Sequence, residues 1–442
     1  MSNTLLETLA IHAGQDKPGN LTSTRAVPVN RTPSKLAKLS VAALLVGASA
    51  IYAEDIPVVN AGGTKISLYG FLQANAVYED GNGNDNENWT EKVLSKAQDG
   101  EGRFTFNVNQ TRIGFNLSGP SGNATEVTGK FESDFVQTRS RTSNAAGLFR
   151  IRQSYGQVKF KDLGLTVLFG QTADLIAPLG APTINQGGLR HQGSLGTRRP
   201  QLRLTQGIGP VEIAVAATED KASQPVLPGF QGSLKGKIPA VWAGEKQNVE
   251  LILSGHYAAE ESAAKDSAEV KAKDADGWGT PSSWSGVASL SLPVISIINL
   301  SGELFYGQNL NNYNNGSIGL SGTTTGGKKD EGIQSLGYWG AATIKLPAGF
   351  SLAGGIGLET IDKNREKKST VVTNKDGTVT TTLNPNKNTV IFGNLKYNVA
   401  ETAFIGFEYA NLKTDYASID KDKKVDSGKL NRFELVFNYA FK

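Results

Sequence analysis

The amino-acid sequence predicts an all-β protein: an antiparallel transmembrane β-barrel of about 16 strands, with an inward-folded constriction loop. Three observations predict this fold. Segments of about ten residues alternate between apolar and polar positions, as lipid-facing and lumen-facing positions do in such barrels. A secretory signal precedes these segments. The final segment presents five aromatic or aliphatic residues in succession on one face.

The composition fits this class and counts against several others. Hydrophobic residues make up 38% of the 442 residues, and alternating strands give such a low average. The net charge of +4, from 45 basic and 41 acidic residues, is too balanced to indicate nucleic-acid binding. The chain has no cysteine and only three histidines. We therefore expect no metal, no cofactor and no enzymatic activity.

Residues 35–53 (KLAKLSVAALLVGASAIYA) have the pattern of a secretory signal peptide. Two lysines precede a short apolar run, and small residues follow it. The run is too short for a membrane anchor, which needs about 20 residues. We expect export across the inner membrane, cleavage after Ala50 or Ala53, and a barrel over residues 54–442.

Residues 1–34 form a separate, extraneous leader. ETLAIHAGQ (7–15), followed by TRAVPVNRTPS (24–34), resembles the N-terminal arm of the PLP-dependent O-acetylhomoserine sulfhydrylases. Nothing downstream supplies a PLP-binding domain around a Schiff-base lysine, so this resemblance implies no activity. A gene-fusion scar, a misplaced start codon or a coincidental polar leader would each explain the segment.

The alternating pattern recurs in sixteen windows. In Lys65–Glu79, Leu72 and Gln73 lie on opposite faces, because only side chains two residues apart share a face of a strand. The window near residue 235 is the weakest, because Pro239 interrupts it. The windows begin near residues 65, 103, 125, 148, 163, 198, 210, 235, 248, 283, 298, 334, 350, 387, 402 and 428.

The connections between these windows are of two kinds. Alternation of short periplasmic turns with long external loops is typical of outer-membrane barrels. The short connections are Lys159–Leu163, Gly207–Pro210, Leu346–Gly349 and Val399–Thr402. The long, polar ones are Asp80–Gly102, Glu260–Pro281, Asn311–Gly332 and Asp362–Lys387.

The last window alternates most cleanly. One face carries Phe433, Leu435, Phe437, Tyr439 and Phe441, with mostly polar residues between them. This end resembles the C-terminal strand that marks outer-membrane barrels for insertion. Such strands usually end on an aromatic residue, whereas here Lys442 follows Phe441.

One long connection, Thr172–Thr197, differs from the others. It contains Pro/Gly clusters, few charges and several apolar residues. A loop of this composition is poorly suited to open water, so we expect it to fold back against the inner wall and narrow the lumen.

Four stretches resemble trimeric bacterial porins, and most closely the DcaP-like group. The resemblance covers residues 60–210 and implies a sixteen-stranded homotrimer in a Gram-negative outer membrane that passes small, often anionic, solutes. The stretches are LYGFLQANAVYED (68–80), QTRIGFNLSGP (110–120), LFRIRQSYGQVKF (148–160) and FGQTADLIAPLGAPTINQGGLRHQGSLGTRRPQLRL (169–204).

The basic residues of this region are candidates for solute selection. Arg150 and Arg152 share one strand face by period two, and Arg199 and Arg203 share another. A charged side chain at the lipid midplane costs about 2–4 kcal/mol, so these faces should point to the lumen. Arginines that line a pore favour anions through their field and through bidentate contacts with carboxylates. The predicted pore-lining set is Arg112, Lys130, Glu132, Asp134, Arg150, Arg152, Arg190, Arg199 and Arg203.

The expected function is therefore passive diffusion of small hydrophilic, carboxylate-type anions, with lipid, lipopolysaccharide and two further copies of the chain as partners. Alternatively, each arginine pairs with an acidic wall residue or with lipopolysaccharide and selects nothing. Two other functions stay open: an adhesive or structural barrel whose long loops bind a partner, and an outer-membrane hydrolase. His256 and Ser254 share a strand face, but no acid partner for catalysis is evident.

Overall fold

The computed structural model describes most of the predicted barrel. The leader at 1–34, the signal peptide at 35–53, the loop at 260–281 and Lys442 lie outside the described residues. Those residues are 59–81, 83, 89–96, 100–136, 148–219, 227–242, 245–259, 282–313, 318, 320, 332–373, 379–419 and 425–441.

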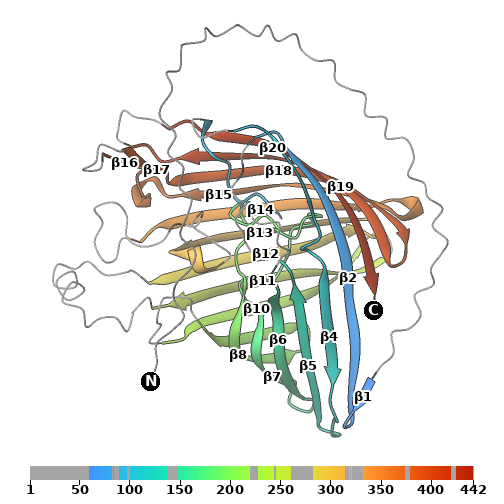
Figure 1. Ribbon diagram of the computed structural model, residues 1–442. Coiled ribbons are helices and arrows are strands. Elements are labelled where there is room, and N and C mark those ends of the chain that lie inside the picture. Colours follow the sequence, from blue (N-terminus) through green and yellow to red (C-terminus); the bar gives the residue numbers. More distant parts are fainter. Residues whose placement is uncertain are drawn as a thin grey trace, which may run out of the picture. The chain divides into compact units, whose positions relative to one another are not determined.

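Long antiparallel strands dominate the structure (Figure 1). They follow one another round a single sheet in the order of the sequence. The strands are β1 (Val59–Ala61), β2 (Thr64–Glu79), β3 (Arg103–Asn107), β4 (Arg112–Ser118), β5 (Thr125–Asp134), β6 (Arg150–Phe160), β7 (Leu165–Ala173), β8 (Arg198–Ile208), β9 (Val211–Thr218), β10 (Gly229–Trp242), β11 (Glu245–Ala258), β12 (Ser283–Ile295), β13 (Ile298–Gln308), β14 (Gln334–Lys345), β15 (Phe350–Ile361), β18 (Pro385–Ala400), β19 (Ala403–Tyr416) and β20 (Gly428–Phe441).

The sheet closes into a barrel at β2. This strand pairs with β20 along one edge and with β3 and β4 along the other. Since β3 and β4 share one edge of β2, they count as one interrupted wall strand, and β1 is only a short addition to β2. The described wall is thus a closed antiparallel barrel of 16 strands, which confirms the predicted fold class and strand number.

The strand that was doubtful in the sequence, β10, runs straight through Pro239. On one side it pairs with β11 along its whole length, and Pro239 lies opposite Asn248 there. On the other side its pairing with β9 ends at Gly236. Beyond Gly236 no residue of β9 pairs with β10, so no backbone N–H of β10 has to donate on that side. Pro239, which has no N–H, is therefore tolerated there.

Apolar side chains face outward and polar ones inward, as the alternation predicts. In β20, Leu435 and Phe437 are about half exposed, whereas Glu434 between its exposed neighbours is buried. In β2, Leu72 is exposed and Gln73 is buried. The exposed residues form the wall that would contact lipid, so the buried polar ones must lie on the inner face.

The predicted short turns are present. β6 is joined to β7 by residues 161–164, β8 to β9 by 209–210, β18 to β19 by 401–402, and β14 to β15 through the 3₁₀ turn Pro347–Gly349. When β3 and β4 are counted as one strand, each of these turns follows an even-numbered strand of the wall. Because neighbouring strands are antiparallel, all of these turns lie at the same end of the barrel. The predicted long, polar connection Asp362–Lys387 contains a small separate hairpin of β16 (Thr370–Thr373) and β17 (Val379–Thr382). Both strands consist only of Thr and Val, the β-branched residues that strands favour.

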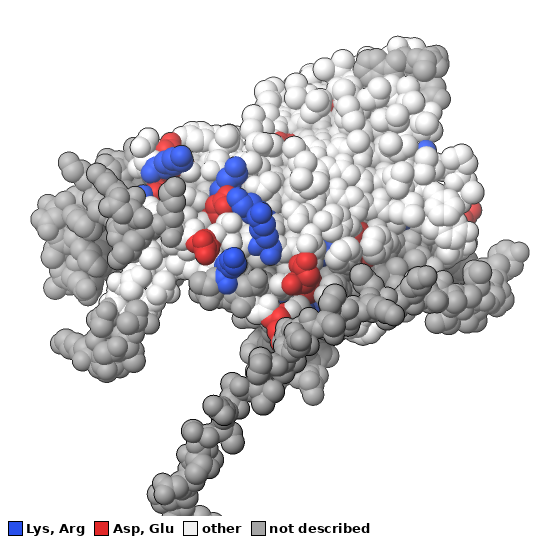
Figure 2. Space-filling model, turned by 90° about the horizontal axis from the view of Figure 1, so that it is seen from above, with Lys and Arg blue, Asp and Glu red and all other residues white. Residues whose placement is uncertain are grey.

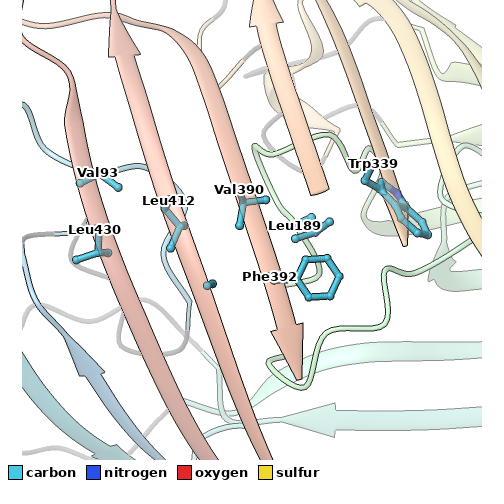
Figure 3. Packing of buried hydrophobic residues seen from close by; sticks show 8 residues of the cluster. Val93, Leu189, Trp339, Val390, Phe392, Leu412 and Leu430 are labelled. Atoms are coloured by element: carbon cyan, nitrogen blue, oxygen red, sulfur yellow. The ribbon is translucent and has the colours of Figure 1, made fainter. Parts of the chain in front are cut away.

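Apolar side chains also gather on part of the inner wall (Figure 3). Leu189, from the connection between β7 and β8, and Val93, from the connection between β2 and β3, are both buried there. They pack with wall residues that include Trp339, Val390, Phe392, Leu412 and Leu430. The inner wall is therefore not uniformly polar, because it gives two connecting segments an apolar surface to pack on.

In the described part of the chain, no helix has the length and apolar character needed to cross a membrane.

Candidate functional site

Charged side chains on the inner faces of β4, β5 and β6 form the first part of the candidate site. Glu132 and Asp134 are buried on β5, between Arg112 of β4 and the two arginines of β6. The pairing of β5 with β6 contains a bulge: Glu132 lies opposite Gln153, and Ser133 lies opposite Ile151. Because the extra residue of this bulge is Arg152, it reaches the same carboxylate, Asp134, as Arg150.

The two carboxylates contact the guanidinium groups of three arginines, Arg112, Arg150 and Arg152. We call these arginines, together with Lys130 and Arg198, the basic cluster. Arg150 makes a bidentate contact with Asp134, with Nε–Oδ1 and Nη2–Oδ2 distances of 2.8 and 2.7 Å. Arg152 bridges both acids, at 2.7 Å from Glu132 and 2.8 Å from Asp134. Arg112 lies 3.6 Å from Glu132. Each carboxylate is thus shared, which leaves the group with more positive than negative charge.

Two further cations belong to the basic cluster. Lys130 lies on the same face of β5, with its ammonium 4.9 Å from the centre of the Tyr69 ring, and the Tyr69 hydroxyl donates to Glu132 at 2.9 Å. Arg198, at the start of β8, lies close enough to Arg152, Arg112 and Arg150 for their like charges to repel it. Period two placed Arg199 on the lumen side and so left out Arg198. At the first residue of a strand, however, alternation does not fix where a long side chain points.

The predicted residues of β8 have different surroundings. Arg199 is almost fully buried: its Nε lies 2.8 Å from Asp174 Oδ1, its Nη2 donates to the Asn312 carbonyl, and its guanidinium stacks 3.9 Å from the centre of the Tyr313 ring. Arg203, four residues on, is only partly buried and donates to Gln201. Arg199 therefore anchors the connections that reach it, whereas Arg203 faces a cavity.

Arg190 contacts the connection between β2 and β3 rather than Glu132 or Asp134, although it interacts electrostatically with Arg150 of the basic cluster. Its Nη1 is 3.2 Å from Glu91, and its guanidinium lies 5.1 Å from the Trp89 ring. The neighbouring His191 places Nε2 3.4 Å from the same carboxylate. Burial would raise the pKa of Glu91, but contacts with His191 and Arg190 outweigh it and lower that pKa to about 2. Burial lowers the pKa of His191.

The segment Thr172–Thr197 touches inner-face residues on the other side of the barrel. Two of its groups bind Glu408 of β19: the Ile184 N–H donates to it at 2.6 Å, and so does the Asn185 side chain. The Leu195 N–H donates to Glu303 of β13 at 2.9 Å. These carboxylates thus serve as acceptors for a segment that begins and ends at β7 and β8.

The same segment approaches the wall backbone closely at Gly193. A Cβ atom at Gly193 would lie 2.0 Å from the Tyr338 carbonyl oxygen of β14, and the residue has a positive φ of 107°. Opposite, a Cβ at Gly357 of β15 would lie 2.1 Å from the Gln192 carbonyl oxygen. Glycine at both positions is therefore required for this approach.

Charged side chains are concentrated in one part of the surface seen in Figure 2, and the rest of the described surface in that view is largely uncharged. An outer wall that contacts lipid must be uncharged, because a charge there is costly.

The hydrolase candidate, His256, lies inside the barrel with serine hydroxyls beside both ring nitrogens and, among the described residues, no carboxylate partner. Its ring nitrogens contact Ser285 at 2.6 Å and Ser283 at 3.0 Å, and its ring stacks on Tyr313. No bond joins it to Ser254, and no carboxylate binds the ring. In the part of the chain that the structure describes, no group of three His, Cys, Asp or Glu side chains could hold a metal ion.

Comparison with known proteins extends the description of the fold. No protein-family model matches the chain, and no curated protein matches it in sequence. Solved structures do match. The outer membrane channel DcaP of Acinetobacter baumannii aligns with a TM-score of 0.67 at 19% identity, over 87% of this chain and 100% of that one. The fold is that of the outer-membrane porins.

Two further porins support this statement. An anion-selective porin from Comamonas acidovorans aligns with a TM-score of 0.56 at 12% identity, over 86% of this chain and 100% of its own. OmpF of Salmonella typhi, solved with daunomycin, aligns with a TM-score of 0.51 at 10% identity, over 87% and 100%. The first match agrees with the resemblance to the DcaP-like group. At these identities the likeness establishes the porin fold alone.

Proposed function

We propose that this protein is an outer-membrane channel for the passive diffusion of small hydrophilic anions, above all carboxylates. The observation that carries the proposal is the excess of positive charge in the basic cluster. Arg112, Lys130, Arg150, Arg152 and Arg198 gather around only two carboxylates. A cluster of this kind inside a barrel raises the local concentration of anions and repels cations.

The geometry of the arginines suits a carboxylate solute in particular. A guanidinium can bind a carboxylate through two parallel hydrogen bonds, as Arg150 already does with Asp134. Arg150 and Arg112 keep 33% and 19% of their side-chain surface exposed, so donors remain accessible. Partial neutralisation by Glu132 and Asp134 keeps the attraction moderate, and an ion must leave a pore as readily as it enters.

We further propose that Thr172–Thr197 narrows the channel beside the basic cluster. The segment leaves the wall at β7 and returns at β8, yet it binds Glu303 and Glu408, which belong to β13 and β19. Gln186 of the segment accepts a hydrogen bond from Arg112. A segment that bridges these strands would bring passing solutes close to the arginines.

The proposed location is the outer membrane of a Gram-negative bacterium, reached through the signal peptide at 35–53. The exposed apolar outer wall supports a lipid environment, and lipopolysaccharide would surround the end with long loops. The proposed assembly is a homotrimer, in which part of the same apolar wall contacts neighbouring copies.

Purified mature protein in a planar lipid bilayer tests the channel itself. We expect step-like current increases as single assemblies insert, and closure in thirds of the full step would support a trimer. Liposome swelling tests the preference: butyrate should enter faster than butylamine, which has the same carbon chain and the opposite charge. Absence of conductance steps from correctly folded protein would contradict the proposal and favour an adhesive barrel.

A further inference from the structure

A second polar region lies on the inner wall of β5 to β9, apart from the basic cluster. It lines a cavity of about 400 Å³. Four charged side chains contribute to it, Glu126, Lys159, Arg203 and Glu212, together with threonines such as Thr128 and Thr205. Small-molecule sites usually enclose about 300–1,000 Å³, so this cavity has the size of a small-solute site.

The cavity lies at the end of the barrel with the short turns. Lys159 comes just before the turn that joins β6 to β7, and Glu212 follows the turn that joins β8 to β9. None of the arginines of the basic cluster lines it. A solute that moves through the barrel would therefore meet the two regions one after the other.

The charges of this cavity balance, unlike those of the basic cluster. Glu126 lies directly opposite Lys159 in the pairing of β5 with β6, and Glu212 interacts electrostatically with Arg203. Glu126, Lys159 and Glu212 are exposed. Among the described residues, none of these three has an ion-pair partner within 4.0 Å. Two positive and two negative groups, which lie on strands of the same part of the wall, are thus available to a solute.

We propose that this cavity is a second solute subsite, selective for small zwitterions of the size of an amino acid or a dipeptide. The inference rests on the proposed channel function and deepens it. The ammonium group of such a solute would contact Glu126 or Glu212, and its carboxylate would contact Arg203 or Lys159, through charge-assisted hydrogen bonds. A simple anion gains one of these contacts but meets two carboxylates, so the cavity favours zwitterions over anions.

Three solutes with a four-carbon chain separate these possibilities: 4-aminobutyrate, butyrate and butylamine. Each is added to the wild-type channel in a planar bilayer at pH 7, and transient block of single-channel current measures binding. We expect saturable block by 4-aminobutyrate with at least about tenfold higher affinity than that of butyrate or butylamine at this site.

The double variant E126Q/E212Q tests the assignment. It should weaken the block by 4-aminobutyrate about tenfold while leaving that by butyrate unchanged or stronger. Glu250→Gln is the control for charge elsewhere: it removes one negative charge from the inner wall, where the double variant removes two, and Glu250 pairs with Lys235 outside the cavity. This variant should bind 4-aminobutyrate like the wild type.

The outcomes distinguish this subsite from the channel function. Conducting wild-type channels that 4-aminobutyrate does not block, or that butyrate blocks equally well, would overturn the subsite and leave the channel standing. Equal weakening by E126Q/E212Q and Glu250→Gln would also overturn it, because the effect would then come from overall charge. Folded protein that forms no channel at all would overturn the proposed function itself.

Discussion

The basic cluster and the buried carboxylates of the far wall show how one sequence pattern gives two kinds of site. Both lie on inner faces of the wall. Glu303 on β13 and Glu408 on β19 each accept hydrogen bonds from a backbone N–H group of Thr172–Thr197. The arginines around Glu132 and Asp134 instead outnumber the acids that they contact. Inward charges thus anchor the internal segment on one wall and remain available to solutes on the other.

The largest expected effect is on ion selectivity and comes from removal of the cations themselves. Arg150→Ala combined with Arg152→Ala leaves Glu132 and Asp134 without most of their counter-charge. The permeability ratio of chloride to potassium should fall at least about tenfold, which corresponds to about 1.4 kcal/mol. Reversal potentials in a potassium chloride gradient measure this.

The matched control for this double variant is Lys345→Ala combined with Lys161→Ala, which also removes two positive charges, because both lysines are exposed at the turn end of the barrel. These changes should leave the ratio unchanged. Unaltered selectivity in a folded double variant would contradict a role of the basic cluster in selectivity and leave these arginines a structural role only.

The next effect concerns pore size and comes from the far wall. Glu408→Ala removes the acceptor for the Ile184 N–H and for the Asn185 side chain. Loss of a buried acceptor costs about 1–3 kcal/mol, so this part of the segment should leave the wall. Single-channel conductance should rise while anion preference remains. Glu401→Gln, at an exposed turn, serves as the control. Equal conductance in both variants would show that Glu408 does not influence the size of the pore.

A smaller, related effect is expected at Gly193. A side chain there would meet the Tyr338 carbonyl oxygen at 2.0 Å and would also have to adopt a positive φ. Gly193→Val should therefore displace the segment from β14 and increase current noise. Gly156→Val, where no atom lies within 4 Å of the added Cβ, is the control. A quiet, unchanged channel in Gly193→Val would show that this contact does not hold the segment.

The smallest effect is expected from pH, through Glu91. Its pKa in the folded protein, about 2, lies below the ordinary value of 4.5, so its ionised form stabilises the contact with Arg190. This stabilisation is complete above about pH 5, declines as the pH falls from there, and is lost near pH 2. Channel noise should therefore be constant between pH 5 and 8 and increase below pH 4.5. Glu91→Gln should show the acidic behaviour at pH 7; if it does not, Glu91 has no part in holding Arg190.

Much of the wall could be predicted from the sequence. Alternation is a local property, so it located all sixteen windows and assigned residues such as Leu435 and Glu434 to the correct faces. Only the extent of β10 was underestimated, because Pro239 is tolerated where the pairing of β10 with β9 has already ended. Whether a proline disrupts a strand depends on its neighbours, which the strand's own sequence does not specify.

The chemistry of individual inward charges was less predictable, because it depends on contacts between distant residues. Arg199 has the same period as Arg203, yet it is buried against Asp174 and Tyr313. Arg198 has the opposite period, yet it joins the basic cluster. Arg150 and Arg152 lie together as predicted, but the β-bulge that aims both at the two acids has no signal in the sequence.

The most direct test of the central claim is the reversal potential of the wild-type channel in a tenfold potassium chloride gradient at low ionic strength. Near 0.01 M salt the Debye length is about 30 Å, so the field of the basic cluster acts across the lumen. The excess of cations over Glu132 and Asp134 predicts a potential with the sign of chloride preference, which shrinks toward zero near 1 M salt, where the Debye length is about 3 Å. Preference for potassium at low salt would contradict the account.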